Sequence, residues 1–141
     1  MTCEELMKRD VACVGLRDTV QHAARLMADL NVGFIPVVDD QRHVLGTITD
    51  RDIAVRLVAQ SFPPQSAVKE IMSREIVYCR PTDDLERAIA VMTERQKSRL
   101  LILDKGDRLL GVVSLSDIVD ALEPVRAGQA LQQIAAREVH A

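Results

Sequence analysis

The chain has 141 residues, of which 48% are apolar and 28% are charged, and its net charge at pH 7 is -3. This composition is typical of a soluble globular protein, and the small negative charge gives no general attraction to nucleic acid or to anionic lipid. Only Phe34, Phe62 and Tyr78 are aromatic, so aromatic platforms that stack single-stranded bases are not expected.

The N-terminal residues and the cysteines both favour a cytoplasmic location. Residues 1–7 include acids where a secretory signal would need a basic and then an apolar stretch. No apolar run approaches the roughly 20 residues that span a bilayer. Cys3, Cys13 and Cys79 are odd in number and scattered, which favours reduced thiols over a disulfide framework. We therefore expect a cytoplasmic protein that binds neither membrane nor nucleic acid.

The first half of the chain predicts alternating helices and strands. Asp18, with Gln21 three residues later, has the spacing of a helix capping box. Apolar residues then recur at helical spacing, and two β-branched runs flank a polar turn at 39–42. The predicted order is helix, strand, helix, two hairpin strands and a helix: 2–8, 11–14, 19–31, 34–38, 44–49 and 50–60.

The second half predicts the same order after a linker that Pro63 and Pro64 stiffen. Asp83 with Glu86 repeats the capping box. The predicted elements are a helix around 71–72, strands at 76–79, 100–103 and 109–114, a helix after Asp83 and another from Leu115. The spacing of apolar residues in 127–141 predicts a short amphipathic helix that begins in the region of Gly128. We expect it to pack on its own domain or on a twin subunit rather than on a foreign partner.

A seven-residue phrase returns 65 positions later. Residues 46–52 read Gly-Thr-Ile-Thr-Asp-Arg-Asp, and residues 111–117 read Gly-Val-Val-Ser-Leu-Ser-Asp. The two copies align without a gap from the pair Glu5 and Glu70 to the pair Leu57 and Leu122. Self-similarity at a fixed offset indicates tandem copies of one unit. Because each copy has only about 55 residues, we expect the two halves to bury their apolar faces against each other.

Each phrase places polar groups where a strand runs into a helix. Gly46 lets a ligand or a neighbouring backbone approach closely. Thr49 offers a hydroxyl beside helix N–H groups, which suits an anion such as phosphate. The ionised carboxylate of Asp52 accepts hydrogen bonds only, which suits the diol of a ribose. The alternative is that these side chains merely cap the helix. The counterparts in the second phrase are Gly111, Ser114 and Asp117.

These motifs closely resemble the CBS domain, named after cystathionine β-synthase, in a tandem pair called a Bateman module. The resemblance covers about residues 2–123 and rests on residues 46–53 and on Phe34-Ile-Pro-Val-Val-Asp39. It implies an α/β fold of the α+β type, in which two βαββα repeats pack with pseudo-twofold symmetry into one module. The expected divisions are repeat 1 at 1–60, a linker at 61–65, repeat 2 at 66–124 and a helical tail at 125–141.

The resemblance also implies a function. Such modules bind adenosyl ligands (AMP, ADP, ATP or S-adenosylmethionine) in clefts between the repeats, act as regulatory ligand sensors, require no cofactor and commonly form homodimers. Asp52 and Asp117 would hold ribose hydroxyls, and Thr49 and Ser114 would contact phosphate or ribose. The residues expected to wall the adenine and to bond it through backbone groups are Val14, Ile35, Pro36, Cys79, Leu100 and Leu101.

The two sites are expected to differ in charge. Arg51 in the first phrase is replaced by Ser116 in the second, whereas Lys97 and Arg99 stand where the first repeat has apolar residues. An arginine can bind phosphate through a fork of donors, although all three cations could equally be solvated surface charges. We expect at most one cleft to bind a multiply charged nucleotide well. Leu101, where the family often has proline, is a minor departure.

Other functions have weaker support in the sequence. The histidines and cysteines show none of the local spacings of zinc sites, and no nucleophile or base has an evident partner, so we read the chain as a non-enzyme. One alternative is an interaction or structural module with vestigial clefts that binds an unknown protein effector. Another is a metal- or redox-responsive stress protein that uses Cys13 and Cys79, although these are better read as buried apolar side chains.

Overall fold

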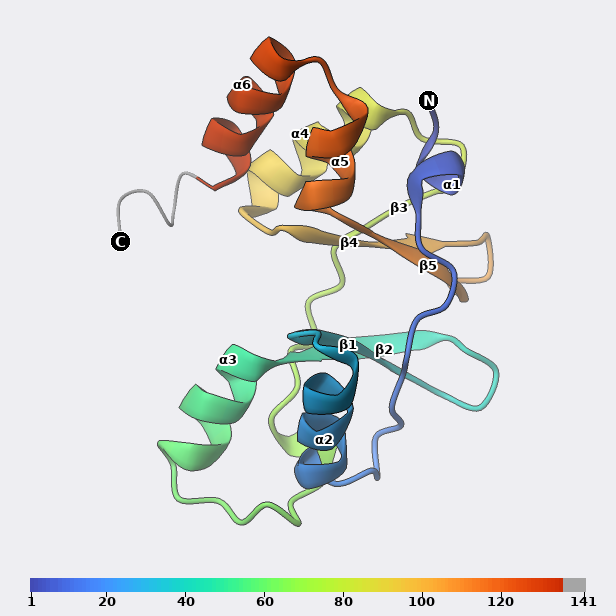
Figure 1. Ribbon diagram of the computed structural model, residues 1–141. Helices are drawn as coiled ribbons and strands as arrows, with labels where there is room; N and C mark the ends of the chain where they lie inside the picture. Colours follow the sequence, from blue (N-terminus) through green and yellow to red (C-terminus); the bar gives the residue numbers. More distant parts are fainter. Residues whose placement is uncertain (136–141) are drawn as a thin grey trace. The chain divides into compact units, whose positions relative to one another are not determined.

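The computed structural model describes residues 1–135, and the chain divides into two compact units (Figure 1). Unit 2 is the continuous segment Val11–Ile76, whereas unit 1 combines Met1–Asp10 with the chain from Val77 onward. Within residues 1–135, no helix combines the length and the apolar character needed to cross a membrane. The fold is mixed α/β, with short helices and short strands in each unit.

Unit 2 is a two-stranded antiparallel hairpin with helices on one side (Figure 1). The β-branched residues of its strands favour extended backbone, and α2 ends at Asn31, which adopts a left-handed conformation. Its core joins residues of α2, β1 and β2 with Val14, Leu57 and Val68. The elements are α2 (Val20–Leu30), β1 (Phe34–Val38), β2 (Val44–Thr49), α3 (Asp50–Asp52), the π-helical turn η1 (Ile53–Val58) and the 3-10 turn η2 (Val68–Glu70).

Unit 1 repeats this plan and adds a third strand, β3, and a last helix, α6, that has no counterpart among the elements of unit 2. Strand β3 pairs parallel to β4, and β4 pairs antiparallel to β5. Helices α4, α5 and α6 lie together on one side of this sheet (Figure 1), and their apolar faces form the second core. The elements are α1 (Cys3–Leu6), β3 (Tyr78–Cys79), α4 (Leu85–Arg95), β4 (Arg99–Leu103), β5 (Leu109–Ser114), α5 (Leu115–Ala121) and α6 (Pro124–Ile134).

Each repeat begins with a lead-in segment, residues 1–10 in the first repeat and 66–76 in the second. Each lead-in segment packs in the unit that the rest of the other repeat forms, so the two repeats exchange these segments. Lys8 and Val112 each donate a backbone N–H to the other's carbonyl, at 2.9 and 3.0 Å. At the matching positions 65 residues away, Ser73 and Thr47 do the same, at 2.8 and 2.9 Å. The segment before Asp10 therefore extends the sheet of unit 1, and the segment before Ile76 extends that of unit 2. Division of the chain by sequence repeat and division by packing thus give different boundaries.

The predicted capping box at Asp18 is wrong by one residue. Thr19 is the N-cap of α2, and its hydroxyl accepts the backbone N–H of His22 at 3.1 Å. Asp18 instead accepts the N–H of Gly15 at 2.7 Å. Both residue types can serve as caps, and here the tight turn before the helix engages the aspartate, so the cap moves to the next residue.

The same displacement occurs in unit 1. Asp84 rather than Asp83 caps α4 by accepting the N–H of Arg87 at 2.8 Å. Asp83 accepts the N–H of Arg80 at 2.8 Å and so closes the preceding turn. Two adjacent residues that can both cap make the helix start ambiguous by one position, and only the turn geometry decides between them.

The hairpin strands at 34–38 and 44–49 are confirmed, and the helix expected at 19–31 is present but one residue shorter at each end. Other predicted bounds are corrected. The strand expected at 11–14 is reduced to one bridge between Val14 and Val37, and that at 76–79 to two residues. The helix expected at 50–60 changes after Asp52 from α to π geometry.

The last helix begins at Pro124 rather than near Gly128. Proline suits the first helical turn because its missing N–H would have no partner there. Ala127, Ala130 and Ile134 are buried, and α6 packs against α4 and α5 of its own unit, as expected. The part of the predicted tail helix at 136–141 lies outside the described residues.

Candidate functional site

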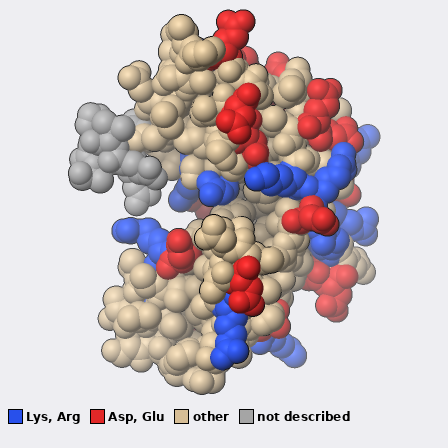
Figure 2. All heavy atoms as spheres, in the orientation of Figure 1, with Lys and Arg blue, Asp and Glu red and all other residues tan. Residues whose placement is uncertain are grey.

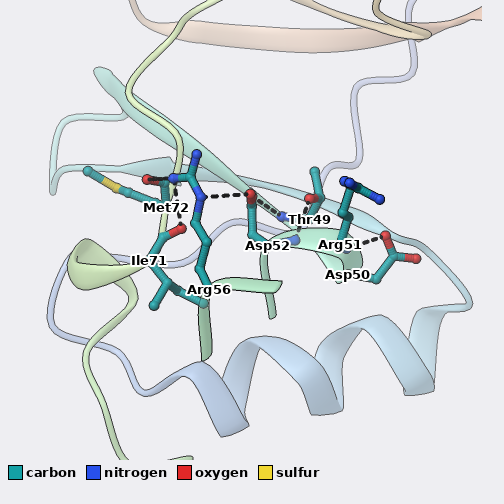
Figure 3. Close-up of polar contacts among 7 residues, drawn as sticks. All are labelled: Thr49, Asp50, Arg51, Asp52, Arg56, Ile71 and Met72. Carbon is teal, nitrogen blue, oxygen red and sulfur yellow. Dashed lines mark hydrogen bonds and ion pairs between the residues drawn. The ribbon is translucent and has the colours of Figure 1, made fainter. Parts of the chain in front are cut away.

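The first phrase forms a reciprocal capping box at the start of α3 (Figure 3). The hydroxyl of Thr49 accepts the backbone N–H of Asp52 at 3.1 Å, and Oδ2 of Asp52 accepts the N–H of Thr49 at 2.9 Å. These bonds satisfy N–H groups that a helix start leaves without partners. The capping alternative is therefore correct for the hydroxyl and for one carboxylate oxygen.

The second phrase repeats this arrangement at the start of α5. Ser114 Oγ accepts the N–H of Asp117 at 3.2 Å, and Asp117 Oδ2 accepts the N–H of Ser114 at 2.9 Å. The hydroxyls of Ser114 and Ser116 also form a hydrogen bond, at 2.8 Å. The two phrases therefore repeat in geometry as well as in sequence. In each phrase the aspartate caps the helix with Oδ2, and its Oδ1 is not part of the cap.

The free oxygen of Asp52 faces Arg56. The distance from Asp52 Oδ1 to Arg56 Nε is 3.8 Å, and the Asp52 side chain is only 14% exposed. The same guanidinium donates through Nη1 to the carbonyls of Ile71 and Met72, at 3.4 and 3.1 Å. Figure 3 shows the guanidinium between the carboxylate and these carbonyls. Arg56 therefore ties α3–η1 to the lead-in segment of the second repeat.

Asp117 has a cation from a different source. Its Oδ1 lies 3.6 Å from Lys8 Nζ, and the side chain of Asp117 is 15% exposed whereas that of Lys8 is 72% exposed. Sequence reasoning missed both cations. Arg56 could have been found, because a residue four positions after an aspartate lies on the same helix face. Lys8 gives no such signal, since only the exchange of the lead-in segments brings it to Asp117.

The glycines of the phrases accommodate backbone. A Cβ on Gly46 would collide with the carbonyl oxygen of Ser73 and lie 3.2 Å from the sulfur of Met72. A Cβ on Gly111 would lie 2.7 Å from the carbonyl oxygen of Lys8, beside Met7. Of the two uses expected for these glycines, the close approach of a neighbouring backbone is the one that the structure displays.

The residues expected to wall the adenine are divided between the two units, and four of the six belong to the apolar cores. The side chains of these residues are all buried, which leaves backbone groups as the means by which this region could contact a ligand. The backbone of Val14 is already paired, because its N–H donates to Pro36 and its carbonyl accepts from Val38. The six residues are Val14, Ile35 and Pro36 in unit 2 and Cys79, Leu100 and Leu101 in unit 1.

The three cations named from the sequence are exposed. The guanidinium of Arg51 lies on the Asp50 side of the phrase, away from the Asp52 carboxylate (Figure 3). Arg99 donates through Nη1 to the carbonyl and the hydroxyl of Ser98, at 3.1 and 3.2 Å. Lys97 is also exposed. On the face drawn in Figure 2, acidic and basic side chains are interspersed on both units.

The structure gives Cys79 a thiol neighbour that the sequence did not indicate. Cys3 and Cys79 are buried in the core of unit 1, whereas Cys13 is partly exposed and belongs to unit 2. Among residues 1–135, no three His, Cys, Asp or Glu side chains are grouped so that they could hold a metal ion.

Comparison with protein families identifies the repeat. The CBS domain model matches the chain twice, at residues 3–59 and 68–124. The chain belongs to the CBS domain family. The CBS domain-containing protein YhcV of Bacillus subtilis is 41% identical over 138 residues, which is 97% of each chain. Hypoxic response protein 1 of Mycobacterium tuberculosis is 30% identical over 118 residues, which cover 83% of this chain and 82% of that protein.

Solved CBS-domain structures share the fold. Hypoxic Response Protein I, solved with two coordinated zinc ions, has a TM-score of 0.80 at 29% identity and covers 87% of this chain and all of its own. CBSX2 in complex with AMP has a TM-score of 0.75 at 22% identity, over 85% of this chain and 94% of its own. The CBS domain pair of MJ0100, in complex with 5'-methylthioadenosine and S-adenosyl-L-methionine, has a TM-score of 0.77 at 21% identity. The match covers 86% of this chain and 98% of that chain. The likeness to the last two shows the fold alone.

Proposed function

We propose that this CBS pair is a regulatory module that binds an adenosyl ligand through its two Thr/Ser-x-x-Asp phrases. The observation that carries the proposal is the pair of matched carboxylates. Each uses Oδ2 to cap a helix and holds Oδ1 beside a cation. An oxygen fixed in this way can accept a ribose hydroxyl without disturbing the cap. The adenosyl ligands of CBSX2 and the MJ0100 CBS pair suggest the ligand class.

Hydroxyl and guanidinium groups near the phrases have separate roles in this proposal. The hydroxyl of Thr49 accepts from the helix start and so keeps its O–H to donate to a ligand oxygen. The hydroxyl of Ser114 also accepts from the helix start and is hydrogen-bonded to Ser116, so these two hydroxyls together leave one O–H to donate. Arg51 and Arg99 are exposed and supply guanidinium forks for phosphate. The ligand acts by shifting the population of conformers, since any state in which it is bound more tightly becomes more abundant.

Isothermal titration with AMP, ADP, ATP and S-adenosylmethionine tests the proposal, using the wild type and the variants Asp52→Asn and Asp117→Asn. Asparagine keeps an oxygen that can cap the helix but loses the charge that favours a diol. We expect micromolar binding of at least one ligand, weakened tenfold or more when the carboxylate of its site is neutralised. Wild-type affinity in both variants, with unfolding midpoints unchanged, would falsify the assignment.

We also propose that two copies associate through unit 2. Val55 and Val58 on η1 are 45% and 67% exposed, whereas the matching positions in unit 1 carry the charged residues Asp120 and Glu123. Burial of such apolar side chains favours a protein contact. The double variant Val55→Asp/Val58→Glu gives unit 2 the charges of unit 1. Light scattering should show a dimer for the wild type and a monomer for this variant, and identical masses would refute the contact.

A further inference from the structure

Two thiols lie side by side in the core of unit 1. Cys3 is on α1 and Cys79 on β3, with exposed fractions of 1% and 2%. Both belong to one apolar cluster, and the backbone N–H of Glu4, next to Cys3, donates to the carbonyl of Pro81 at 3.0 Å, two residues after Cys79. The backbone N–H of Cys3 donates to the carbonyl of Asp83 at 2.8 Å, which holds α1 beside the segment that follows β3. Both cysteines are free thiols.

The matching positions of unit 2 show that packing does not require sulfur. Val68 stands where unit 1 has Cys3, and Val14 stands where it has Cys79. Val68 and Val14 are 0% and 2% exposed and share the core of unit 2. The same place in the fold is therefore filled in one unit by two aliphatic side chains and in the other by two thiols. What the thiols add is chemistry, because adjacent thiols can be oxidised to a disulfide.

We propose that Cys3 and Cys79 form a reversible disulfide that locks the segment Met1–Asp10 onto unit 1. The bond would join the first helix of the chain to β3 and so close a long covalent loop, which limits opening of the segment. The same segment carries Lys8, which pairs with both the backbone of Val112 and the carboxylate of Asp117. Oxidation would therefore hold in place the cation beside the second phrase. This inference does not depend on which ligand that phrase binds.

The chemistry balances with a hydroperoxide as the oxidant. The thiolate of Cys3 attacks one peroxide oxygen, the O–O bond breaks, and a sulfenic acid forms as hydroxide leaves. The thiol of Cys79 then attacks this sulfur, the S–S bond forms, and water leaves. In total two thiols are oxidised and one hydrogen peroxide is reduced to two waters.

The order of attack follows from the surroundings of the two sulfurs. The interaction with Cys79 lowers the pKa of Cys3 even though burial opposes this shift. The interaction with Cys3, together with burial, raises the pKa of Cys79. Cys3 is assigned as the thiol that attacks because it lies on α1, the short helix whose opening gives an oxidant access. Access requires α1 to open, and a helix of only four residues depends on its tertiary contacts rather than on its own stability.

The experiment uses the full chain with Cys13→Ser, which leaves the pair as the only thiols. The matched control adds Cys3→Val and Cys79→Val, the residues that unit 2 uses at these positions. Both proteins are treated in the folded state with hydrogen peroxide and then with dithiothreitol. Intact mass, peptide mapping and thermal unfolding are measured after each step.

We expect the pair to lose two hydrogens and to yield a peptide that joins Cys3 to Cys79, both reversed by dithiothreitol. The unfolding midpoint should rise by several degrees on oxidation, and hydrogen exchange in α1 should slow. The control should show neither change. Free thiols after treatment, sulfinic acid in place of the cross-link, or a disulfide that forms only in denaturant would overturn the proposal. Oxidation of wild-type protein gives the same readouts if either variant folds poorly.

Discussion

Lys8 Nζ lies 3.6 Å from Asp117 Oδ1, so a residue of the first sequence repeat provides the cation for the carboxylate of the second phrase. In the first phrase, Asp52 receives its cation from Arg56 of its own helical segment at 3.8 Å. The two carboxylates occupy equivalent positions in the two repeats, whereas the two cations do not. On the function proposed above, we expect ligand selectivity between the two phrases to depend on whether the cation is held by neighbouring carbonyls, as Arg56 is, or is largely exposed, as Lys8 is.

Gly46→Ala should destabilise the protein by about 1–3 kcal/mol, because the new Cβ collides with the carbonyl oxygen of Ser73 and the strand pairing has to shift. Gly111→Ala should have a similar effect through Lys8. Urea unfolding measures the change.

Gly128→Ala is the matched control for these glycines. Gly128 lies inside α6, and nothing is within 4 Å of an added Cβ. Because alanine favours helix over glycine, this variant should gain about 0.5–1 kcal/mol. Equal effects of Gly46→Ala and Gly128→Ala would show that the contact with Ser73 is not what requires the glycine.

Asp52→Ala should lower the free energy of unfolding by about 1 kcal/mol even without ligand, because the N–H of Thr49 loses its acceptor. Asp52→Asn should lose less, since the amide oxygen can take over the cap. Chemical denaturation of both variants in the absence of ligand separates the capping role from the binding role. A larger loss for asparagine than for alanine would contradict the capping geometry.

Arg56→Met should cost about 1–2 kcal/mol, because the carbonyls of Ile71 and Met72 lose a charged donor. Arg56→Lys should recover only part of this loss, since an ammonium lacks the planar fork that reaches the carboxylate and the carbonyls together. Arg51→Ala, at an exposed position of the same segment, is the control and should change stability by less than about 0.5 kcal/mol. Hydrogen exchange at residues 71–73 should quicken in Arg56→Met and stay unchanged in Arg51→Ala.

Acid should loosen the attachment of α6. Arg126 donates to Glu86 at 2.7 Å, and this bond lowers the pKa of the Glu86 carboxyl in the folded state. The contribution is therefore present above the ordinary glutamate pKa of about 4.3 and is lost as the pH falls through the lowered value. The effect should be small and sensitive to salt, since the Glu86 side chain is 62% exposed. Wild type should lose more stability than Glu86→Gln over this range, and parallel pH profiles would argue against the ion pair.

Local sequence patterns predicted the helices and strands that have a clear residue pattern. They did not predict which of two adjacent residues caps a helix, or which segments distant in the sequence pack together. The hairpin strands 34–38 and 44–49 were predicted to the residue because two β-branched runs flank a clear polar turn. The caps of α2 and α4 were wrong by one residue because adjacent Asp and Thr, or Asp and Asp, can serve either the turn or the helix.

The partners of the site residues were harder to predict than the residues themselves. The phrase at 46–52 is visible in the sequence, and so is the spacing of Asp52 and Arg56. The contact between Lys8 and Asp117 and the pair formed by Cys3 and Cys79 depend on the exchange of the lead-in segments, which leaves no local pattern. Sequence repeats indicate which residues correspond, but not which repeat each one packs with.

The exchange also sets the order in which the protein can be completed during synthesis. Unit 2 is one continuous stretch, so every contact inside Val11–Ile76 is available once Ile76 has emerged from the ribosome. Met1–Asp10 is made before unit 2, whereas its strand partner Val112 is made after unit 2. A ribosome working at about 5–20 residues per second leaves this segment waiting for several seconds. A nascent-chain pause beyond Ile76 would therefore present a finished unit 2 beside an N-terminal segment still open to chaperones.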